Sequence, residues 1–496
     1  MSKQKIGTVD EVRRTDRISI ERYGVPSLSL MDGAAEAVFR FLLTLSPRGK
    51  TVCILAGKGN NAGDGFALAR KLRPVVSKVT VILLADGEMT ADAKHYYDAC
   101  IADGIECGGS LPKGQDIYVD AVFGTGFRGD LPENVRAAFE KISAEPAIKV
   151  SIDVPSGISG DGQYIADGAF RADHTVTFQI LKLCHILPKS AAYCGTVSVG
   201  EIGLPAEAIE EAGITTEILE CPQLPRKDET SHKTTNGTLL SIVGSRAYQG
   251  AATLSLLSAF SGGCGLVVGV IPDGIYPAVA AKVTGAVLCD LPSAAQGGID
   301  AAAFRDAFED ITDRRPTAVL TGSGMGVSAD TAKIVARVLR MPLPAVIDGD
   351  GLRYVKNLRN REAETVLTPH IGEFARMTGR DAAEVCGADR LTIARDFAKE
   401  NRCVLVLKDH YTVIASPDGR AFLHCAPNAG LAKGGSGDVL AGLIASFLAQ
   451  GTDAVTAAKC GVWYHSLAGR AAVERRGVYA VRPEDVIESF GEILRS

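Results

Sequence analysis

The sequence lacks the cysteine spacings that indicate a zinc site or a redox-active pair, although it contains 12 cysteines. These cysteines are scattered between Cys53 and Cys460, and no two of them form a C-x-x-C pair. Such a distribution is typical of small buried apolar side chains in a reducing compartment. The first residues also lack the apolar segment of a secretory signal peptide, so we expect a cytoplasmic location.

The sequence also has little excess charge, with a formal net charge of −5 over 496 residues. That balance gives no electrostatic argument for binding nucleic acid or an anionic membrane. Long hydrophobic runs are missing, apart from the uncharged residues 251–272, which are about long enough to cross a bilayer. This stretch contains three serines and a Gly-Gly-Cys-Gly break, so we expect a buried helix, a turn and a buried strand instead. Neither a nucleic-acid partner nor a membrane partner is expected.

A chain of this length is expected to form about two or three domains. In its first half, short apolar segments predict strands at residues 51–56, 79–85, 117–122, 149–152 and 174–177. Amphipathic segments between them, for example 66–72 and 134–142, predict helices. Short strands that are apolar throughout and separated by helices are typical of a parallel sheet covered on both faces. The first half is therefore predicted to be a Rossmann-like α/β domain.

The alternation stops around residues 219–236, where two prolines, clustered charges and no periodicity indicate a linker. We place the boundary close to residue 224 and assign domains 1–222 and 223–496. The second half predicts strands at residues 238–243, 266–271, 318–321, 345–347, 404–407 and 412–415, and helices at 251–260, 329–339, 390–400 and 439–450. No internal repeat relates the halves, so we expect two different α/β domains.

The first half carries Gly-rich loops and carboxylates after its predicted strands. GKGNNAGDG (57–65), which is neither a G-x-G-x-x-G motif nor a P-loop, opens a helix whose N–H groups favour a phosphate. Asp120 and Asp153 follow two other strands. The carboxyl ends of parallel strands meet in one crevice, where these groups could hold a monovalent cation and orient a polar ligand. Either aspartate alone could simply cap a turn, but the set favours a ligand site.

In that order, GKGNNAGDG, DAVFGTGFRGD (120–130) and SIDVPSG (151–157) resemble the epimerase domain of the NAD(P)H-hydrate repair enzymes, over about residues 8–220. The resemblance implies that Asn61, Asp120 and Ser156 coordinate potassium and that Asp153 acts at the reacting ring. It also implies a set of substrate contacts: Asn60, Asn61, Ala62, Gly63, Asp64, Gly124, Thr125, Gly126, Phe127, Arg128, Gly129, Asp130 and Asp153.

In the second half, the most specific motif is NAGLAKGGSGD (428–438), which runs into an apolar helix. Gly434, Gly435 and Gly437 would let the backbone approach a ligand, and the N–H groups that open the helix would form an anion hole. Asp438 in the first turn could accept a proton from a substrate hydroxyl. The alternative is that Asp438 is an ordinary carboxylate at a helix N-terminus. Upstream, His370 between Thr-Pro and Gly-Glu is a plausible substrate contact.

With GSGMG (322–326), VIDGDGL (346–352), VLTPHIGEF (366–374) and VLKDHYT (406–412), this motif resembles the dehydratase domain of the same enzymes, over about residues 228–494. The resemblance implies a ribokinase-like fold and phosphorylation of the ring 6-hydroxyl by ADP with magnesium, followed by loss of phosphate. It implies that Asp438 is the base and that the other contacts fall into three sets: an anion hole of Gly435, Ser436 and Gly437, nucleotide contacts at Lys408, Asp409, His410, Tyr411, Thr412 and Gly437, and hydrated-cofactor contacts at Ala251, Gly324, His370 and Asp438.

Together the resemblances predict a bifunctional metabolite-repair enzyme. One domain would interconvert the R and S epimers of NADHX and NADPHX, and the other would dehydrate the S epimer with ADP, giving AMP and phosphate. A homo-oligomer formed through the C-terminal domain is also implied. One alternative is a small-molecule kinase with an accessory domain, which would release a stable phosphorylated alcohol. Another, for the first half, is a non-catalytic nucleotide sensor or scaffold.

The sequence departs from the family pattern at three charged positions. Arg128 stands where a lysine is common, and a guanidinium stays protonated, so the acid–base pair of the epimerase is left open. Asp409 replaces a glycine and would repel nucleotide phosphates unless it points away or meets magnesium. Lys433 replaces a small residue and could neutralise charge or simply be solvated.

Overall fold

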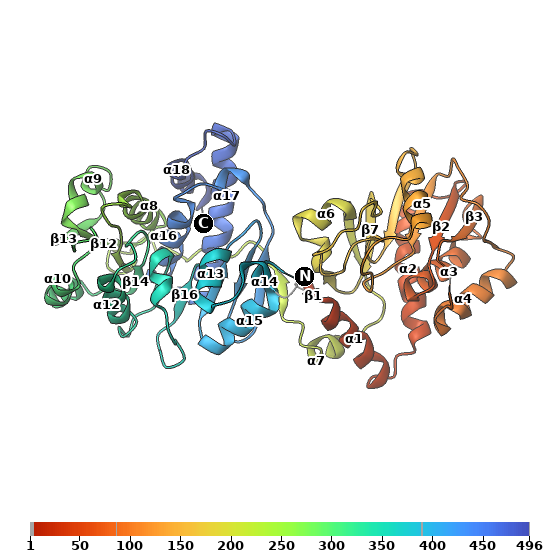
Figure 1. Ribbon diagram of the computed structural model, residues 1–496, viewed down its shortest axis with the longest axis horizontal. Coiled ribbons are helices and arrows are strands. Elements are labelled where there is room, and N and C mark those ends of the chain that lie inside the picture. Colours follow the sequence, from red (N-terminus) through yellow and green to blue (C-terminus); the bar gives the residue numbers. More distant parts are fainter. Residues whose placement is uncertain (1–3, 86, 388–389, 496) are drawn as a thin grey trace. The chain divides into compact units, whose positions relative to one another are not determined.

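The structure is a computed structural model that describes residues 4–85, 87–387 and 390–495 (Figure 1). It divides into two compact units, Met1–Glu217 and Ile218–Ser496. Helices and strands alternate along each unit, so the predicted α/β class is confirmed for both. Within the described ranges, no helix is both long enough and apolar enough to cross a membrane.

The first unit is built on a parallel sheet with the strand order β4-β3-β2-β5-β6-β7-β9. Its strands are β1 (Lys5–Gly7), β2 (Thr51–Ala56), β3 (Lys78–Leu83), β4 (Glu106–Cys107), β5 (Ile117–Ala121), β6 (Ile148–Ile152), β7 (His174–Phe178), β8 (Leu181–Lys182), β9 (Thr196–Gly200) and β10 (Thr216–Ile218). Its helices are α1 (Val9–Glu21), α2 (Ser27–Thr44), α3 (Asn60–Leu72), α4 (Ala91–Ala102), α5 (Glu133–Ser143), η1 (Leu183–His185), α6 (Pro188–Cys194) and α7 (Ala206–Glu211). The strand order reverses between β2 and β5, and ligands of open parallel sheets bind at the carboxyl ends of the strands at such a reversal.

Helices cover both faces of this sheet, which explains why its central strands are apolar throughout. Successive residues of β2 point to opposite faces, so Ile54 packs under α2, α3 and α4, whereas Leu55 packs under α5. On the α5 side, the rings of Phe139 and Phe170 meet edge to face with centroids 5.1 Å apart. The two layers hold the strand ends, and therefore the loops after them, in fixed positions.

A small ribbon holds the first helix against this unit. β1 pairs in parallel with β8 and antiparallel with β10. α1 begins with a capping box in which Thr8 and Glu11 each accept a hydrogen bond from the other's backbone N–H. The helix then packs through Val12 against Ile180. As a result, α1 lies beside the residues that follow β7.

The second unit has the strand run β13-β12-β11-β14-β15-β16-β17-β18-β19, parallel from β13 to β17 and antiparallel beyond. Its strands are β11 (Thr238–Ile242), β12 (Leu266–Pro272), β13 (Val287–Leu291), β14 (Ala318–Thr321), β15 (Ala345–Ile347), β16 (Thr365–Leu367), β17 (Val404–Leu407), β18 (Thr412–Ala415) and β19 (Ala421–His424). Its helices are α8 (Gln249–Ser261), η2 (Asp273–Ile275), α9 (Tyr276–Ala280), α10 (Ala301–Asp306), α11 (Phe308–Thr312), α12 (Ala329–Val338), η3 (Gly349–Tyr354), α13 (Ile371–Thr378), α14 (Ala382–Cys386), α15 (Arg390–Asn401), η4 (Ala429–Leu431), α16 (Ser436–Ala449), α17 (Ala454–Arg476) and α18 (Pro483–Ile493). Here the strand order reverses between β11 and β14.

Helix α16 is buried along most of its length between α8 and α17 (Figure 1). Small residues allow this close packing: a Cβ atom added at Gly442 would lie 2.4 Å from the carbonyl oxygen of Ser255 in α8. One added at Gly461 in α17 would lie 2.2 Å from the side chain of Ile444. The position of the N-terminus of α16 is therefore determined by packing along the whole helix.

Most predicted elements are confirmed, and the differences have local causes. The uncharged residues 251–272 form most of α8, a turn and β12, as predicted. The helices predicted at 66–72 and 439–450 begin earlier, at Asn60 and Ser436, because the Gly-rich motifs themselves form the first turns. The C-terminal sheet also ends in an antiparallel hairpin, β18–β19, of which the sequence analysis predicted only the first strand.

Candidate functional site

The first candidate site is a cavity of about 300 Å³ at the strand-order reversal of the first unit. Its lining combines the ends of the central strands with α1, α2, α4 and the residues after β7: Val12, Arg13, Asp16, Ile20, Ser27, Leu30, Met31, Ala34, Asn60, Asn61, Asp64, Asp92, Gly124, Thr125, Asp153, Phe178, Lys182, Ile202 and Leu204. Apolar and ionisable side chains therefore face the same space, as in many small-molecule sites.

Asp153 and Lys182 form a buried ion pair at this cavity. Lys182 Nζ lies 2.5 Å from Asp153 Oδ1, and the two side chains are only 2% and 15% exposed, respectively. Thr177 Oγ1 donates a hydrogen bond to the same carboxylate oxygen at 2.9 Å. Burial alone would raise the pKa of Asp153, but the charge and hydrogen bond of Lys182 hold it below its ordinary value. Asp153 is therefore ionised despite its burial.

The backbone at Asp153 is held in an unusual conformation. Its φ of +64° lies in the left-handed region, which is uncommon for a residue with a side chain. His185 Nε2 lies 2.8 Å from the Asp153 carbonyl oxygen, and His185 Nδ1 accepts the backbone N–H of Lys182 at 3.1 Å. Burial lowers the pKa of His185 to about 4, so the ring is neutral and donates through Nε2. The imidazole thus fixes the two members of the ion pair relative to each other.

Two further carboxyl groups, Asp16 and Asp64, line the same cavity. Burial raises the pKa of Asp16 to about 6, against the opposing charge of Lys182. Burial and the charges of Asp153 and Asp16 raise the pKa of Asp64 well above its ordinary value. Beside the ionised Asp153, the cavity therefore holds Asp16 and Asp64, which retain protons more readily, a combination typical of proton-transfer sites.

The residues predicted to hold potassium lie together beneath this cavity. Ser156 donates to Asp120 from Oγ at 2.6 Å and from the backbone N–H at 2.7 Å. Asn61 Nδ2 donates to the Phe123 carbonyl oxygen at 3.0 Å, and Ser156 Oγ accepts the Phe123 N–H at 2.8 Å. Asn61 Oδ1 is buried, and none of the residues that the structure describes forms a hydrogen bond with it. A buried oxygen of this kind is costly unless a cation or donor satisfies it, so the donor set fits a monovalent cation.

Only part of the predicted Gly124–Asp130 contact segment reaches the cavity. Gly124 and Thr125 line it, whereas Phe127 is buried in the core and Arg128 is exposed outside the lining. Asp130 accepts a hydrogen bond from Tyr164 Oη at 2.8 Å. The structure thus does not bring Arg128 to Asp153, and Lys182 provides the cation there instead.

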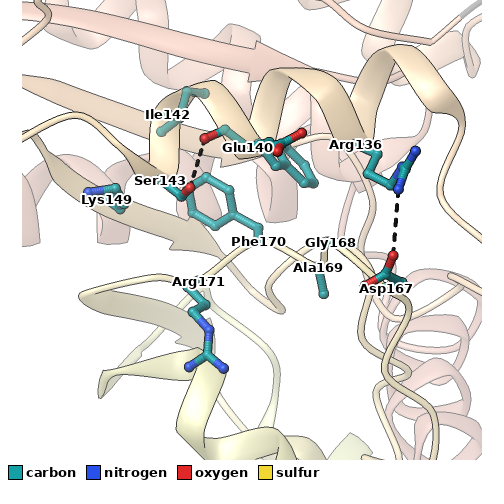
Figure 2. A pocket seen from close by; sticks show the side chains of 11 residues that line it. Arg136, Glu140, Ile142, Ser143, Lys149, Asp167, Gly168, Ala169, Phe170 and Arg171 are labelled. Carbon is teal, nitrogen blue, oxygen red and sulfur yellow. Dashed lines mark hydrogen bonds and ion pairs between the residues drawn. The ribbon is translucent and has the colours of Figure 1, made fainter.

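A second groove of the first unit, of about 350 Å³, lies between α5 and residues 167–171 (Figure 2). None of the predicted site residues lines it. Arg136 forms ion pairs with Glu133 at 2.8 Å and with Asp167 at 3.6 Å, and the Arg171 guanidinium stacks 4.1 Å from the Tyr193 ring. Because its arginines are already engaged, this groove offers less chemistry than the cavity around Asp153 despite its similar volume.

The second candidate site is a cavity of about 860 Å³ in the second unit. It is lined by the segments after β16 and β17, the residues before α16, and one face of α17: His370, Ile371, Lys408, Asp409, His410, Tyr411, Thr412, His424, Ala426, Pro427, Asn428, Ala429, Leu431, Ala432, Lys433, Ser436, Gly437, Leu440, Val462, His465 and Ser466. All of the predicted nucleotide-binding residues line this one cavity.

The Gly-rich turn before α16 has the geometry of an anion-binding helix N-terminus. Gly435 is the N-cap, with φ +99°, and a Cβ atom there would lie 2.5 Å from Leu254 Cδ1. A Cβ atom at Gly437 would lie 3.2 Å from Lys408 Nζ. Glycine at these positions brings the first N–H groups of the helix close to an ammonium group, which favours a phosphate between them.

Asp438, the predicted base, lies in the first turn of α16. Burial and the negative charge of Asp348 raise its pKa to about 7, against the opposing charge of Lys408. Lys408 Nζ lies 3.2 Å from Asp348 Oδ1, and Thr368 Oγ1 donates to the same oxygen at 2.6 Å. A carboxyl group that titrates near neutral pH is suited to accept a proton from a hydroxyl group.

Two of the predicted hydrated-cofactor contacts, Ala251 and Gly324, lie at the strand-order reversal of the second unit, whereas His370 lines the second cavity. A Cβ atom at Gly324, where φ is +62°, would lie 2.6 Å from the Ala251 Cβ atom, so these residues are in close contact. The neighbouring Ser323 Oγ donates to Asp348 Oδ2 at 3.0 Å, which connects this loop to Lys408. His370 caps α13, where its Nδ1 accepts the backbone N–H of Gly372 at 3.0 Å.

Two departures from the family pattern have structural explanations. Asp409 points to the buried Arg390, with Oδ2 and Nη2 2.8 Å apart, and the Arg390 guanidinium stacks on the Tyr411 ring at 4.3 Å. The negative charge of Asp409 is therefore compensated within the protein. Lys433 Nζ donates to the carbonyl oxygens of Tyr479 and Val481 at 2.7 and 2.6 Å, so it fastens the loop before α18.

Several functional groups were not predicted from the sequence. Lys182 and His185 were not predicted, although LKLCH (181–185) begins four positions after the end of a predicted strand. Asp348 lies within the VIDGDGL motif, but the sequence predicted no role for it. His465, on α17, lines the second cavity, and burial lowers its pKa to about 4. Among the described residues, no group of three or more His, Cys, Asp or Glu side chains has the geometry of a metal site.

The fold and the two sites define a class of protein: two unlike α/β units, one with a carboxylate–lysine cavity and one with an anion-binding helix N-terminus. The comparisons agree with that class. A family model described as NAD(P)H-hydrate dehydratase matches residues 239–491, and one described as YjeF-related protein N-terminus matches residues 27–184. The chain belongs to the family of bifunctional NAD(P)H-hydrate repair enzymes, so the resemblance predicted from the motifs is confirmed.

Relatives match along nearly the whole chain. The bifunctional NAD(P)H-hydrate repair enzyme Nnr of Thermofilum pendens is 34% identical, with 99% of this chain and 96% of that protein covered. The enzyme of the same name from Moorella thermoacetica is 33% identical over the same shares. Among solved structures, the ADP/ATP-dependent NAD(P)H-hydrate dehydratase of Bacillus subtilis, co-crystallised with ATP and Mg²⁺, is 28% identical with a TM-score of 0.49. That match covers 55% of this chain and 93% of the other.

Proposed function

We propose that this protein repairs hydrated NADH and NADPH in the cytoplasm, with the first unit interconverting the R and S epimers and the second dehydrating the S epimer with ADP. Family membership supports the pair of activities. The dehydratase assignment is supported by the position of Asp438 in the first turn of α16, where burial and the charge of Asp348 raise its pKa to about 7 against the charge of Lys408. The twelve cysteines are all free thiols, which suits a reducing compartment.

In the dehydratase reaction, the oxygen of the ring 6-hydroxyl group attacks the β-phosphoryl group of ADP, and AMP leaves. Asp438 accepts the hydroxyl proton during this attack. The backbone N–H groups of Gly435, Ser436 and Gly437, together with Lys408, stabilise the charge on the transferring group. The phosphate ester is then eliminated as the ring C5 loses a proton, which restores the reduced nicotinamide. Magnesium, when bound with ADP, neutralises phosphate charge. A homo-oligomer formed through the second unit stays a prediction.

In the epimerase unit, Asp153 acts at the reacting ring, and potassium is held by Asn61, Asp120 and Ser156. The unpartnered, buried Oδ1 atom of Asn61 supports this assignment of the cation site. Potassium would keep the loops after β2 and β5 together. Exchange of potassium for tetramethylammonium should lower the melting temperature of wild type but not that of Asn61→Leu, since a cation that binds only the folded state stabilises it.

The proposed function is tested by absorbance at 340 nm with separate R and S epimers of hydrated NADH, ADP and magnesium. We expect absorbance to recover from both epimers, with equimolar AMP and phosphate. A stable phosphorylated product and no recovery of absorbance would instead identify a small-molecule kinase. Recovery from the S epimer alone would contradict the epimerase assignment and leave the dehydratase assignment standing.

A further inference from the structure

The substrate of the proposed epimerase has a carbon that inverts by a particular route. Hydration of the reduced ring places a hydroxyl group on C6, next to the ring nitrogen N1. Such a carbon is a hemiaminal, which inverts when the ring opens to an aldehyde and closes on the other face. Opening requires a base for the hydroxyl proton and an acid for N1, and closing requires the reverse transfers.

Asp16 occupies a position suited to the second of these proton transfers. It lies on α1 one helical turn after Val12, which packs into the unit, and it lines the same cavity as the Asp153–Lys182 pair, whose charges act on it. No described residue forms a hydrogen bond or ion pair with its carboxyl group, whereas Asp153 is held by Lys182 and Thr177. The Asp16 carboxyl group is therefore available to a ligand, although it is partly buried.

We infer that Asp16 delivers a proton to N1 as the ring opens and takes it back as the ring closes, while Asp153 takes and returns the hydroxyl proton. This assignment rests on the proposed epimerase function. It names an acid–base pair for the epimerase that does not require Arg128, which lies outside the cavity.

Asp153 and Asp16 differ in charge state as a base and an acid should: Asp153 is ionised, and Asp16 retains its proton more readily. Burial raises the pKa of Asp16 to about 6, whereas the charge of Lys182 overcomes burial and lowers the pKa of Asp153. Asp153 is thus ionised and ready to accept a proton, and Asp16 exchanges a proton near neutral pH. The titratable and charged groups that line the cavity with Asp16 come from α1, α3, α4, the loop after β6, and β8: Arg13, Asp64, Asp92, Asp153 and Lys182.

The proposed step is balanced without an added reactant. The C6–OH proton moves to the Asp153 carboxylate, the C6–O bond becomes a carbonyl, and the C6–N1 bond breaks with its electron pair on N1. The Asp16 proton then bonds to N1, which gives an open enamine and an aldehyde. After rotation about C5–C6, N1 attacks the other face of the aldehyde, Asp16 recovers its proton, and Asp153 returns the other to the new hydroxyl group. Neither nucleotide nor redox cofactor is consumed.

The test measures interconversion of purified R and S hydrated NADH by chromatography in the full chain, without ADP and with potassium present. Asp16→Asn keeps the size of the side chain but cannot carry the proton. Wild type should lose rate above about pH 6, because Asp16 then loses its proton. In Asp16→Asn we expect kcat to fall by about 100-fold or more with KM nearly unchanged, and this alkaline loss of rate to be absent. Asp10→Asn, an exposed aspartate on the same helix, should behave as wild type.

Asp16→Glu separates proton transfer from a structural role. We expect it to regain part of the rate together with the alkaline loss of activity, because a carboxyl group is restored about one methylene further out. An Asp16→Asn variant with wild-type kcat and pH profile would overturn the inference. If wild type itself failed to interconvert the epimers, the proposed function would fall before any variant was compared.

Discussion

Lys182 Nζ lies 2.5 Å from Asp153 Oδ1 although the two are 29 positions apart in sequence, and Lys182 is almost completely buried while Asp153 is 15% exposed. The ion pair forms because β8 follows β7 closely and brings the lysine back over the end of β6, where Asp153 stands. A buried ion pair contributes little net stability, but removal of one partner leaves an uncompensated charge. Removal of the charge of either Lys182 or Asp153 alone is therefore expected to affect both folding and activity.

Replacement of the lysine tests this relationship. Lys182→Met should destabilise the first unit by about 3–5 kcal/mol, because the ionised Asp153 would lose its partner in a buried site. The double variant Lys182→Met/Asp153→Asn should recover much of that loss, since neither charge remains. Urea unfolding followed by circular dichroism measures both free energies. Equal destabilisation of the single and double variants would contradict the ion-pair explanation.

The dehydratase rate should rise with pH around neutrality. Asp438 accepts a proton only when ionised, and its pKa is raised to about 7, so the rate should increase between about pH 6 and pH 8. Asp438→Asn should lower kcat by about 10²–10⁴-fold and leave the dissociation constant of ADP within a few-fold of wild type. Calorimetry with ADP and assays of the S epimer measure the two quantities. A flat pH profile in wild type, with ADP saturating, would be incompatible with Asp438 as the base.

The glycine turn before α16 provides a matched pair of substitutions. Gly435→Ala should cost about 1–3 kcal/mol of stability and weaken ADP binding, because alanine is strained at φ +99° and its Cβ would contact Leu254. Gly434→Ala should have a much smaller effect, since its Cβ would have no atom within 4 Å. Thermal unfolding and ADP titration of both variants test the difference. Similar losses in both would show that the strain at Gly435 is not the cause.

Asp16 should make the first unit less stable as the pH rises. The folded protein binds the Asp16 proton more tightly than the unfolded chain, with a pKa of about 6 against 3.8, so the unfolding free energy falls between about pH 4 and pH 6. Above that window wild type has lost up to about 3 kcal/mol that Asp16→Asn does not lose. The variant should therefore unfold at a higher temperature than wild type at pH 7.5 but not at pH 3.5. A lower melting temperature at both values would contradict this account.

The local motifs made much of the fold and both sites predictable. Apolar runs between Gly-rich turns located the central strands, and the bounds of β2, β14, β15, β17 and β18 agree with the prediction residue for residue. The same turns indicated Asp153 and Asp438, because residues that follow parallel strands or open a helix meet a ligand. The helix starts were less accurate, since glycine is a poor helix former and yet forms the first turns of α3 and α16.

By itself, then, the sequence determined the α/β class and the family, and it predicted where the two candidate sites lie, because the motifs behind each prediction are short segments of the chain. Only the tertiary structure decided which charges meet. Lys182 joins Asp153, Asp16 enters their cavity from α1, and Arg390 compensates Asp409, whereas Arg128 stays outside. These pairings depend on packing between distant segments, and burial at the packed sites determines the pKa values. Neither the charge pairings nor the pKa values follow from the local spacing of residues, so both required the tertiary structure.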